Sequence, residues 1–103
     1  MEKRRPAYDL ALIKEVCGDP GRLVMTTTAA LSARALGFTT TDISTLIRGI
    51  DRRMFYKSMT SYADARVWQD VYHVPADGLT LYVKFTADVV TEFVVLSFKE
   101  KGE

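Results

Sequence analysis

The second half of the chain has several polar residues at alternating positions: lysines, a tyrosine, a glutamine and the single histidine. The set comprises Lys57, Gln69, His73, Tyr82, Lys84 and Lys99. Breaking a phosphodiester bond needs positive charge on the phosphate oxygens, a proton acceptor for the nucleophile and a proton donor for the leaving oxygen. Lysine supplies the charge and tyrosine can supply the proton, so these residue types suit cleavage of a nucleic-acid backbone.

Other catalytic arrangements are poorly supported by the residues present. His73 is the only histidine, which excludes a mechanism that uses two histidines as acid and base. Near a predicted hairpin end, it can have a structural, a phosphate-binding or a proton-transfer role. Cys17 is the only cysteine, so neither an internal disulfide nor a cysteine-based zinc site can form. The carboxylates of the strand half are scattered at Asp64, Asp70, Asp77 and Asp88. This scatter disfavours a two-metal nuclease. We expect neither a metal nor a cofactor.

The elements that must position these residues change type half-way along the chain. Apolar residues at helical spacing predict helices over 8–17, 29–36 and 43–50, with caps at Thr27 or Thr28 and at Thr41. Aromatic and β-branched residues then predict strands over 55–60, 67–74, 79–86 and 91–99, with a weaker strand over 22–26. The short connections favour antiparallel hairpins. Residues 1–103 are therefore expected to form one α+β domain, in which N-terminal helices pack on an antiparallel β-sheet meander.

The two-residue period of a strand assigns side chains to faces. If Val74 lies opposite Leu79, then Tyr72, Asp70 and Trp68 face the core together with the apolar residues of the next strand. In the same register Val94, Leu96 and Phe98 join that core. Asp70 is a misfit there, and it either lies at the sheet margin or accepts backbone hydrogen bonds. The opposite, polar face is predicted to hold Phe55, Lys57 (across from Gln69), Met59, Gln69, Val71, His73, Thr80, Tyr82, Lys84, Phe93, Val95, Ser97 and Lys99.

Cations beside exposed aromatic residues suit single-stranded RNA, whose phosphates attract charge and whose unstacked bases pack on flat side chains. Met59, His73 and Lys84 are candidate RNA contacts on this face. The alternative is that the lysines discourage edge-to-edge pairing of sheets, which is the stronger interpretation for Lys84 taken alone. Arg52 and Arg53 precede the first long strand and extend a path for RNA. Their alternative role, preferred for the neighbouring Arg48, is to stabilise the C-terminus of the third helix.

Composition limits these interpretations. The 14 lysines and arginines nearly balance 13 acidic residues, giving a formal net charge of +1. Overall charge therefore does not indicate nucleic-acid binding, and an RNA site must come from local clustering. No apolar run is long enough to span a bilayer, and no signal region follows the basic N-terminus. We expect a cytoplasmic protein.

Several segments resemble the MqsR (motility quorum-sensing regulator) toxin family: Met1–Arg4, Phe55–Thr60, Trp68–Tyr72, Tyr82–Lys84 and Ser97–Lys101. The resemblance covers essentially the whole chain. It implies a RelE-like ribonuclease fold, cleavage of messenger RNA at GCU-type sites, and growth inhibition as the toxin of a type II toxin–antitoxin system. It also implies an MqsA-like antitoxin that binds zinc and DNA, so that DNA is contacted only indirectly. The residues that match the family's functional set are Lys57, Gln69, Tyr82 and Lys99. His73 stands where the family commonly has arginine.

These expectations give a hypothesis for the reaction. A ribose 2′-hydroxyl attacks the adjacent phosphate, leaving a 2′,3′-cyclic phosphate and a 5′-hydroxyl. Lys57 and Lys99 supply charge, Tyr82 donates a proton, and Gln69 orients phosphate or ribose. In the absence of a carboxylate base, the acceptor is a lysine whose pKa is lowered by neighbouring cations. The alternatives are a non-catalytic RNA-binding or regulatory module that acts through its antitoxin complex, and a purely structural partner in such a complex.

Overall fold

The computed structural model describes residues 1–102, in which three helices precede most of an antiparallel sheet. The helices are α1 (Leu10–Cys17), α2 (Thr27–Ala35) and α3 (Thr40–Arg48), followed by a 3₁₀ turn, η1 (Arg52–Met54). The strands are β1 (Glu2–Lys3), β2 (Phe55–Thr60), β3 (Trp68–Ala76), β4 (Leu79–Asp88) and β5 (Glu92–Glu100), and they lie in the sheet in this order. The α+β prediction is confirmed, and the two-residue β1 is an unforeseen addition to it.

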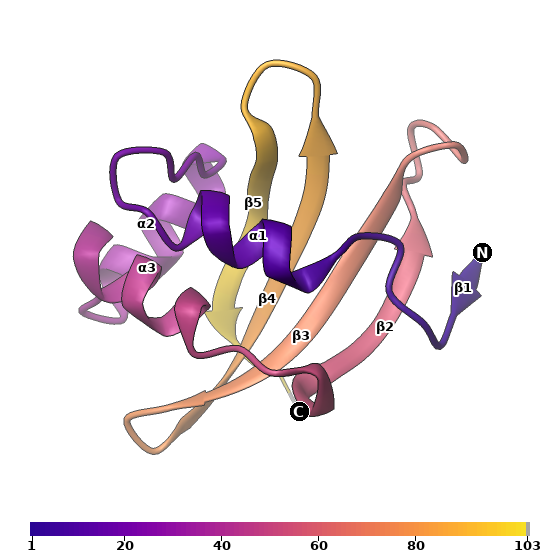
Figure 1. Ribbon diagram of the computed structural model, residues 1–103. Coiled ribbons are helices and arrows are strands. Elements are labelled where there is room, and N and C mark those ends of the chain that lie inside the picture. The colour runs from indigo at the N-terminus through magenta and orange to yellow at the C-terminus, as the bar shows by residue number, and fades with distance from the viewer. Residues whose placement is uncertain (103) are drawn as a thin grey trace.

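The three helices lie on one face of the sheet, as Figure 1 shows. Their buried residues, including Ile13, Ala33 and Ile47, meet Leu81, Val83 and other apolar residues of the sheet in a single core. In the part of the chain that the structure describes, no helix covers the other face of the sheet (Figure 1). The same face carries the predicted polar residues, so the fold leaves them accessible.

Each helix begins at a polar cap, one or two residues before the predicted cap for α2 and α3. The Thr26 hydroxyl accepts a hydrogen bond from the amide of Ala29 at the start of α2. At the start of α3, Thr39 and Asp42 form a reciprocal capping box. The prediction of Thr27 or Thr28 and of Thr41 was wrong because the runs Thr26–Thr28 and Thr39–Thr41 offer several hydroxyls. The first threonine of each run has the extended backbone that a cap needs.

The hairpin between β3 and β4 turns on two residues, Asp77 and Gly78, whose φ angles are 51° and 80°. Two consecutive positive φ angles are typical of the tight type I′ turn. Val74 consequently pairs with Leu81, and the predicted pairing of Val74 with Leu79 was wrong by two residues. An even shift preserves the two-residue period, so every side chain of β3 and β4 kept its predicted face.

Two bulges correct the predicted faces of β2 and β5. In β2 the extra residue is Tyr56, so Phe55 turns to the core side and packs edge-on against Tyr72 at 5.5 Å between ring centroids. In β5 the extra residue is Leu96. The residues before it change faces, so Phe93 and Val95 are buried in the core, against the prediction.

The structure also differs from the predicted strands in smaller ways. Val94 and Leu96 are half-buried and lie outside the core to which they were assigned, whereas Phe98 is in it, as predicted. Lys57 pairs with Val71, two residues from the predicted Gln69. The predicted strand over 22–26 is reduced to one isolated bridge, between Met25 and Val95.

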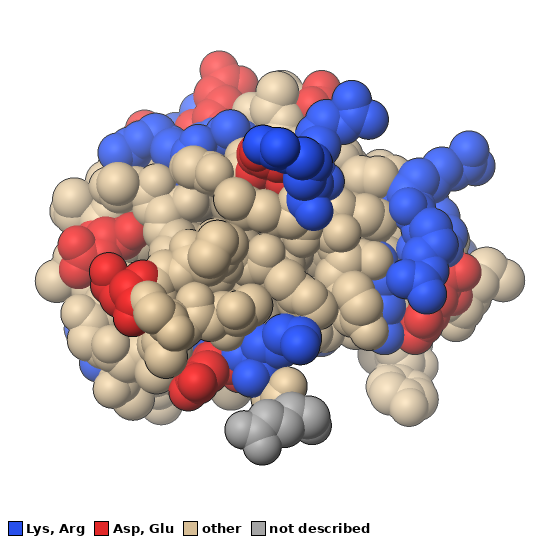
Figure 2. Space-filling model, turned by 90° about the horizontal axis from the view of Figure 1, so that it is seen from below, with Lys and Arg blue, Asp and Glu red and all other residues tan. Residues whose placement is uncertain are grey.

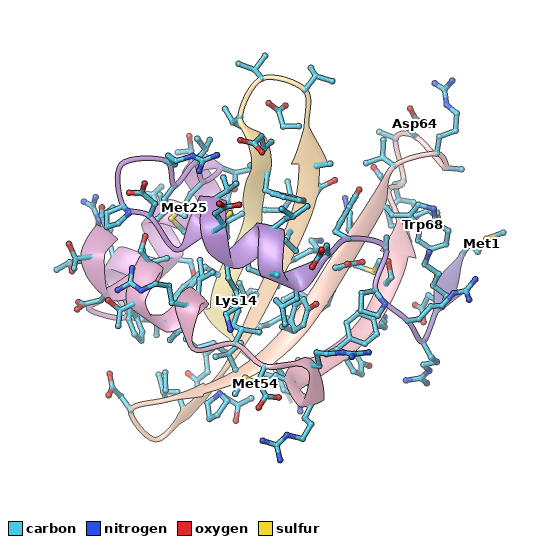
Figure 3. All side chains as sticks on the ribbon, in the orientation of Figure 1. Met1, Lys14, Met25, Met54, Asp64 and Trp68 are labelled. Carbon is cyan, nitrogen blue, oxygen red and sulfur yellow. The ribbon has the colours of Figure 1, made fainter. Side chains whose placement is uncertain are left out.

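The N-terminal segment is fastened to the sheet at two places. β1 pairs with β2 through Glu2 and Lys3, and the Lys3 ammonium lies 4.1 Å from the ring centroid of Trp68 at the start of β3. Figure 3 labels Trp68 beside this end of the chain, near Met1. Further along, the fully buried Asp70 carboxylate accepts hydrogen bonds from the amides of Ala7 (3.0 Å) and Tyr8 (2.9 Å). Asp70 therefore faces the core side because backbone donors satisfy it, which was one of the two expected explanations.

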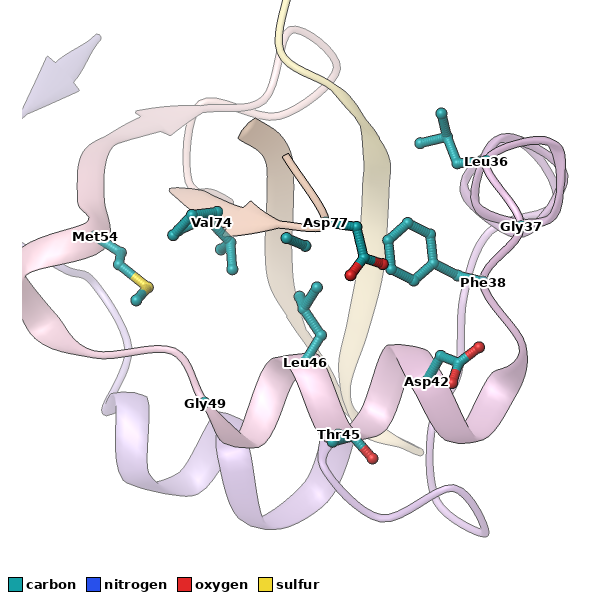
Figure 4. A pocket seen from close by; sticks show the side chains of 12 residues that line it. Leu36, Gly37, Phe38, Asp42, Thr45, Leu46, Gly49, Met54, Val74 and Asp77 are labelled. Carbon is teal, nitrogen blue, oxygen red and sulfur yellow. The ribbon is translucent and has the colours of Figure 1, made fainter. Parts of the chain in front are cut away.

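A groove of about 430 Å³ separates α3 from the β3–β4 hairpin, with Phe38, Leu46 and Asp77 among its lining (Figure 4). It belongs to the helical side of the sheet and contains none of the predicted site residues. Within residues 1–102, no helix has the length and apolar character needed to cross a membrane.

Candidate functional site

The uncovered side of the sheet, which we call the open face, brings most of the predicted site residues together in adjacent cross-strand rows. One row pairs His73 with Tyr82 and Tyr82 with Lys99. In the next, Lys57 pairs with Val71, Val71 with Lys84 and Lys84 with Ser97. Met59 pairs with Gln69 beyond them. The open face thus comprises Met59, Lys57, Gln69, Val71, His73, Tyr82, Lys84, Ser97 and Lys99, together with the bulged Tyr56.

Val71 provides an apolar floor in the middle of the open face. It is fully buried although it points away from the helices, and it does not belong to the main core cluster. Its cross-strand neighbours are Lys57 and Lys84. The aliphatic stems of two lysines can cover such a residue while their ammonium groups remain near water. The pairing places the two lysines on either side of Val71.

Lys57 has a carboxylate partner that the sequence did not suggest. Its Nζ lies 2.8 Å from Oε2 of Glu2, with 20% of the Lys57 side chain and 59% of the Glu2 side chain exposed. The hydrogen bond that Lys57 donates to the Glu2 carboxylate raises the pKa of Lys57, and the same bond lowers the pKa of Glu2. Lys57 is therefore a firmly protonated cation, suited to holding a phosphate oxygen and unsuited to accepting a proton.

Lys84 has the opposite electrostatic environment. Its half-buried position lowers its pKa, and the charges of Lys99 and Lys57 lower it further. A lower pKa increases the fraction of neutral amine at a given pH, and only the neutral amine accepts a proton. The lowered pKa expected of a proton-accepting lysine is thus found at Lys84. Taken alone, Lys84 was the lysine for which the sequence most favoured a simple surface role.

Aromatic rings form a patch next to the lysines. The rings of Tyr56 and His73 are stacked, with centroids 4.2 Å apart and planes inclined by 22°, and Tyr82 lies 6.1 Å from His73. The Lys99 ammonium is 5.3 Å from the Tyr82 ring centroid. Burial raises the pKa of Tyr82, so its hydroxyl stays protonated at neutral pH. This patch offers flat surfaces for bases beside a hydroxyl that can donate a proton.

Tyr56 is the residue of this patch that sequence reasoning missed. Strict alternation from Lys57 assigns Tyr56 to the core side, and the bulge brings it to the open face, where 41% of it is exposed. No glycine or proline marks the bulge in the sequence. The one available signal was the unusual run of two aromatic residues before Lys57.

Comparisons with known proteins now bear on this site. A family model described as "Motility quorum-sensing regulator, toxin of MqsA" matches residues 5–100. The chain is also 38% identical over 101 residues to the mRNA interferase toxin MqsR of Escherichia coli (strain K12), covering 98% of this chain and all of that protein. The chain belongs to the MqsR toxin family. The matched range contains every predicted site residue.

His73 is the member of the open face at which this MqsR-family chain departs from the arginine expected by resemblance. Burial lowers the pKa of His73, and the charge of Lys101 lowers it further. The imidazole is therefore largely neutral at neutral pH, where arginine would be a permanent cation. The stacked Tyr56–His73 pair suits base stacking better than it suits holding a phosphate.

Arg52 and Arg53 are not part of the open face. Both are exposed in η1, and they line a hollow of about 490 Å³ with Arg4, Arg5 and two apolar residues. Arg48 instead donates hydrogen bonds to the Gly18 carbonyl and to the Thr45 hydroxyl, in keeping with the structural role preferred for it. Within residues 1–102, no three histidine, cysteine or acidic side chains gather as a group that could hold a metal ion.

Proposed function

We propose that this protein is the toxin of a toxin–antitoxin pair and an endoribonuclease that cleaves single-stranded messenger RNA on the open face. The observation that carries the proposal is the placement of Lys57, Lys84, Lys99 and Tyr82 in two adjacent rows of a sheet face that no helix covers. Membership of the MqsR toxin family and the relative named an mRNA interferase toxin support it. By the same resemblance we propose GCU-type cleavage sites.

The residues of the open face fit the steps of a metal-independent cleavage. Lys57 and Lys99 hold the phosphate oxygens, on which negative charge grows as the ribose 2′-hydroxyl attacks. Tyr82 donates its proton to the departing 5′-oxygen, because burial keeps its hydroxyl protonated. Gln69, one row away from Lys57, orients the ribose or the phosphate. The products are a 2′,3′-cyclic phosphate and a free 5′-hydroxyl.

Lys84 is our proposed acceptor for the proton of the 2′-hydroxyl. It shares a row with Lys57, and its pKa is lowered by burial and by the two neighbouring ammonium groups. Proton transfer in the transition state contributes about 10²–10⁴-fold to rate. Met59 and the stacked pair of Tyr56 and His73 flank this centre and pack against bases.

The partners follow from the same proposal. Besides the RNA substrate we propose an MqsA-like antitoxin that binds zinc and DNA through its own residues, so that this chain reaches DNA only within the complex. The place of action is the cytoplasm, where messenger RNA is translated.

The test is a digest of a GCU-containing RNA by purified protein in excess chelator, with mapping of the new ends. We expect cyclic phosphate and 5′-hydroxyl ends, and loss of cleavage in Lys57→Ala combined with Tyr82→Phe. Arg34→Ala, a charge change on α2 remote from the open face, serves as the control and should cleave normally. Cleavage abolished by the chelator would contradict the metal-independent mechanism, and an active double variant would contradict the site.

A second candidate is a non-catalytic RNA-binding or regulatory module that acts through its antitoxin complex. The Glu2–Lys57 ion pair favours it, because the carboxylate neutralises a lysine that the cleavage mechanism requires. Induction in cells separates the two. The ribonuclease arrests growth until the antitoxin is supplied, and the arrest depends on Lys57 and Tyr82, whereas the binding module has no such dependence.

A further inference from the structure

Four arginines surround a hollow at the start of β2, on the helical side of the sheet. Its lining, which we call the arginine hollow, consists of Arg4, Arg5, Pro6, Arg52, Arg53 and Phe55. Figure 2, seen from below, shows basic side chains at the upper centre and on the right, where β1 and β2 lie in Figure 1, with acidic side chains beside both groups. The four arginines of the hollow are a local excess of positive charge in a chain whose net charge is +1.

The charges of the hollow are mostly uncompensated by the protein. Arg53 pairs with Asp51 at 3.0 Å. Among the ion pairs of residues 1–102, none involves Arg4, Arg5 or Arg52. The guanidinium groups of these three arginines are free to attract an anion, and their planar donors fit phosphate well.

Both segments that carry the arginines are held in place. The first is tied by β1 on one side and by the buried Asp70 carboxylate, which binds the amides of Ala7 and Tyr8, on the other. The second is fixed by Asp51, whose side chain accepts the Arg53 amide at the start of η1. A backbone fixed in advance loses less conformational entropy when a ligand binds to its side chains.

We propose that the arginine hollow binds backbone phosphates of the same single-stranded RNA, in a segment that flanks the nucleotides on the open face. This rests on the proposed function. η1 runs directly into β2, so the Arg53 and Lys57 backbones are at most about 14 Å apart. β1 pairs only with Ser58 and Met59 of β2, so within residues 1–102 the β2 edge at 55–57 has no strand partner on that side. A strand of a few nucleotides can pass around it.

RNA fits this hollow better than an acidic peptide for two reasons. Phe55 of the hollow directly precedes Tyr56 and Lys57, which place a ring and a cation on the open face at the other side of β2. Its apolar members, Pro6 and Phe55, provide flat surface for ribose or base between the guanidinium groups. Binding there extends the substrate footprint beyond the cleavage site, so the minimal substrate and the preferred substrate should differ in length.

The experiment compares a short RNA that spans only the open face with an extended RNA that also reaches the hollow. The variant combines Arg4→Ala, Arg5→Ala and Arg52→Ala, and the control removes equal charge elsewhere through Lys14→Ala, Arg34→Ala and Arg66→Ala. We expect the hollow variant to raise KM for the extended RNA about tenfold or more at low salt and to leave the short RNA unchanged. The slope of log affinity against log salt should fall by about 2, from three lost phosphate contacts.

The same measurements can overturn the assignment. Equal losses on both RNAs, or equal losses in the hollow variant and the control, would exclude a specific flanking site, with thermal unfolding verifying that both variants fold. Unchanged RNA binding with lost binding of a polyglutamate peptide would assign the hollow to an acidic protein instead. If the unmodified protein cleaves neither RNA, the proposed function fails, and fluorescence anisotropy with the same two RNAs still decides on the hollow.

Discussion

Lys57 and Lys84 lie in one cross-strand row, yet their pKa values move in opposite directions. Lys57 gains a carboxylate, Glu2, which stabilises its charged form. Lys84 gains partial burial and two ammonium neighbours, which destabilise its charged form. Two residues of one type can thus hold a phosphate and accept a proton, because their surroundings separate their protonation states.

This difference predicts the pH dependence of cleavage. The neutral fraction of Lys84 grows as pH rises towards its lowered pKa, so kcat/KM should rise between about pH 6 and about pH 9. Lys84→Arg keeps a charge of similar reach but cannot release its proton. We expect it to lower kcat about 10²-fold or more and to abolish the rise of kcat/KM with pH, whereas Lys99→Arg should keep that rise. A Lys84→Arg protein with an unchanged pH profile would show that Lys84 only binds RNA.

At the scale of elements, the sequence predicted the face of a side chain correctly where the side chains of a strand alternate between the two faces without interruption. β3 and β4 alternate without interruption, so Gln69, His73, Tyr82 and Lys84 were assigned to the correct face despite an incorrect register. The bulges at Tyr56 and Leu96 each add one residue, which reverses the faces of their neighbours. No residue type marks either bulge.

The strand β1 could not be predicted from the sequence either. Two residues carry no period, and Glu2–Lys3 forms a strand because the β2 edge is available to it. The pairing brings Glu2 to Lys57 from 55 residues away in the chain. A contact between such distant residues arises from tertiary structure, which explains why the sequence suggested no carboxylate in the site.

The attachment of this N-terminal segment to β3 gives the second prediction. Asp70→Ala removes a buried carboxylate and leaves the amides of Ala7 and Tyr8 without acceptors. We expect a loss of about 3 kcal/mol in the free energy of unfolding, measured by urea denaturation. Asp70→Asn should lose less, because its amide oxygen still accepts one of these bonds. Glu15→Ala, an exposed change on α1, should stay within about 0.5 kcal/mol. Equal stability of Asp70→Ala and the unmodified protein would refute this anchoring role.

At the scale of the whole molecule, the sheet separates stability from function. The helices and the core occupy one side, whereas the open face presents the lysines and rings on the other. Substitutions of these lysines and rings should therefore change activity with little effect on folding. A probe of the opposite side is needed to measure folding without disturbing the site, and the chain contains one.

Cys17 is that probe, because it is the only thiol and is fully buried in the core at the C-terminal end of α1. Burial raises its pKa to about 11, which suppresses the reactive thiolate. In the native protein, labelling by an aromatic disulfide reagent should be slower than for a free thiol by about 10³-fold or more, since it requires an opening with a free energy of several kcal/mol. Asp70→Ala should accelerate labelling by about tenfold for each 1.4 kcal/mol of lost stability, whereas Lys84→Arg should leave the rate unchanged. Rapid labelling of the folded protein would mean that the core opens around Cys17 without global unfolding, and the separation of the two sides would then not hold.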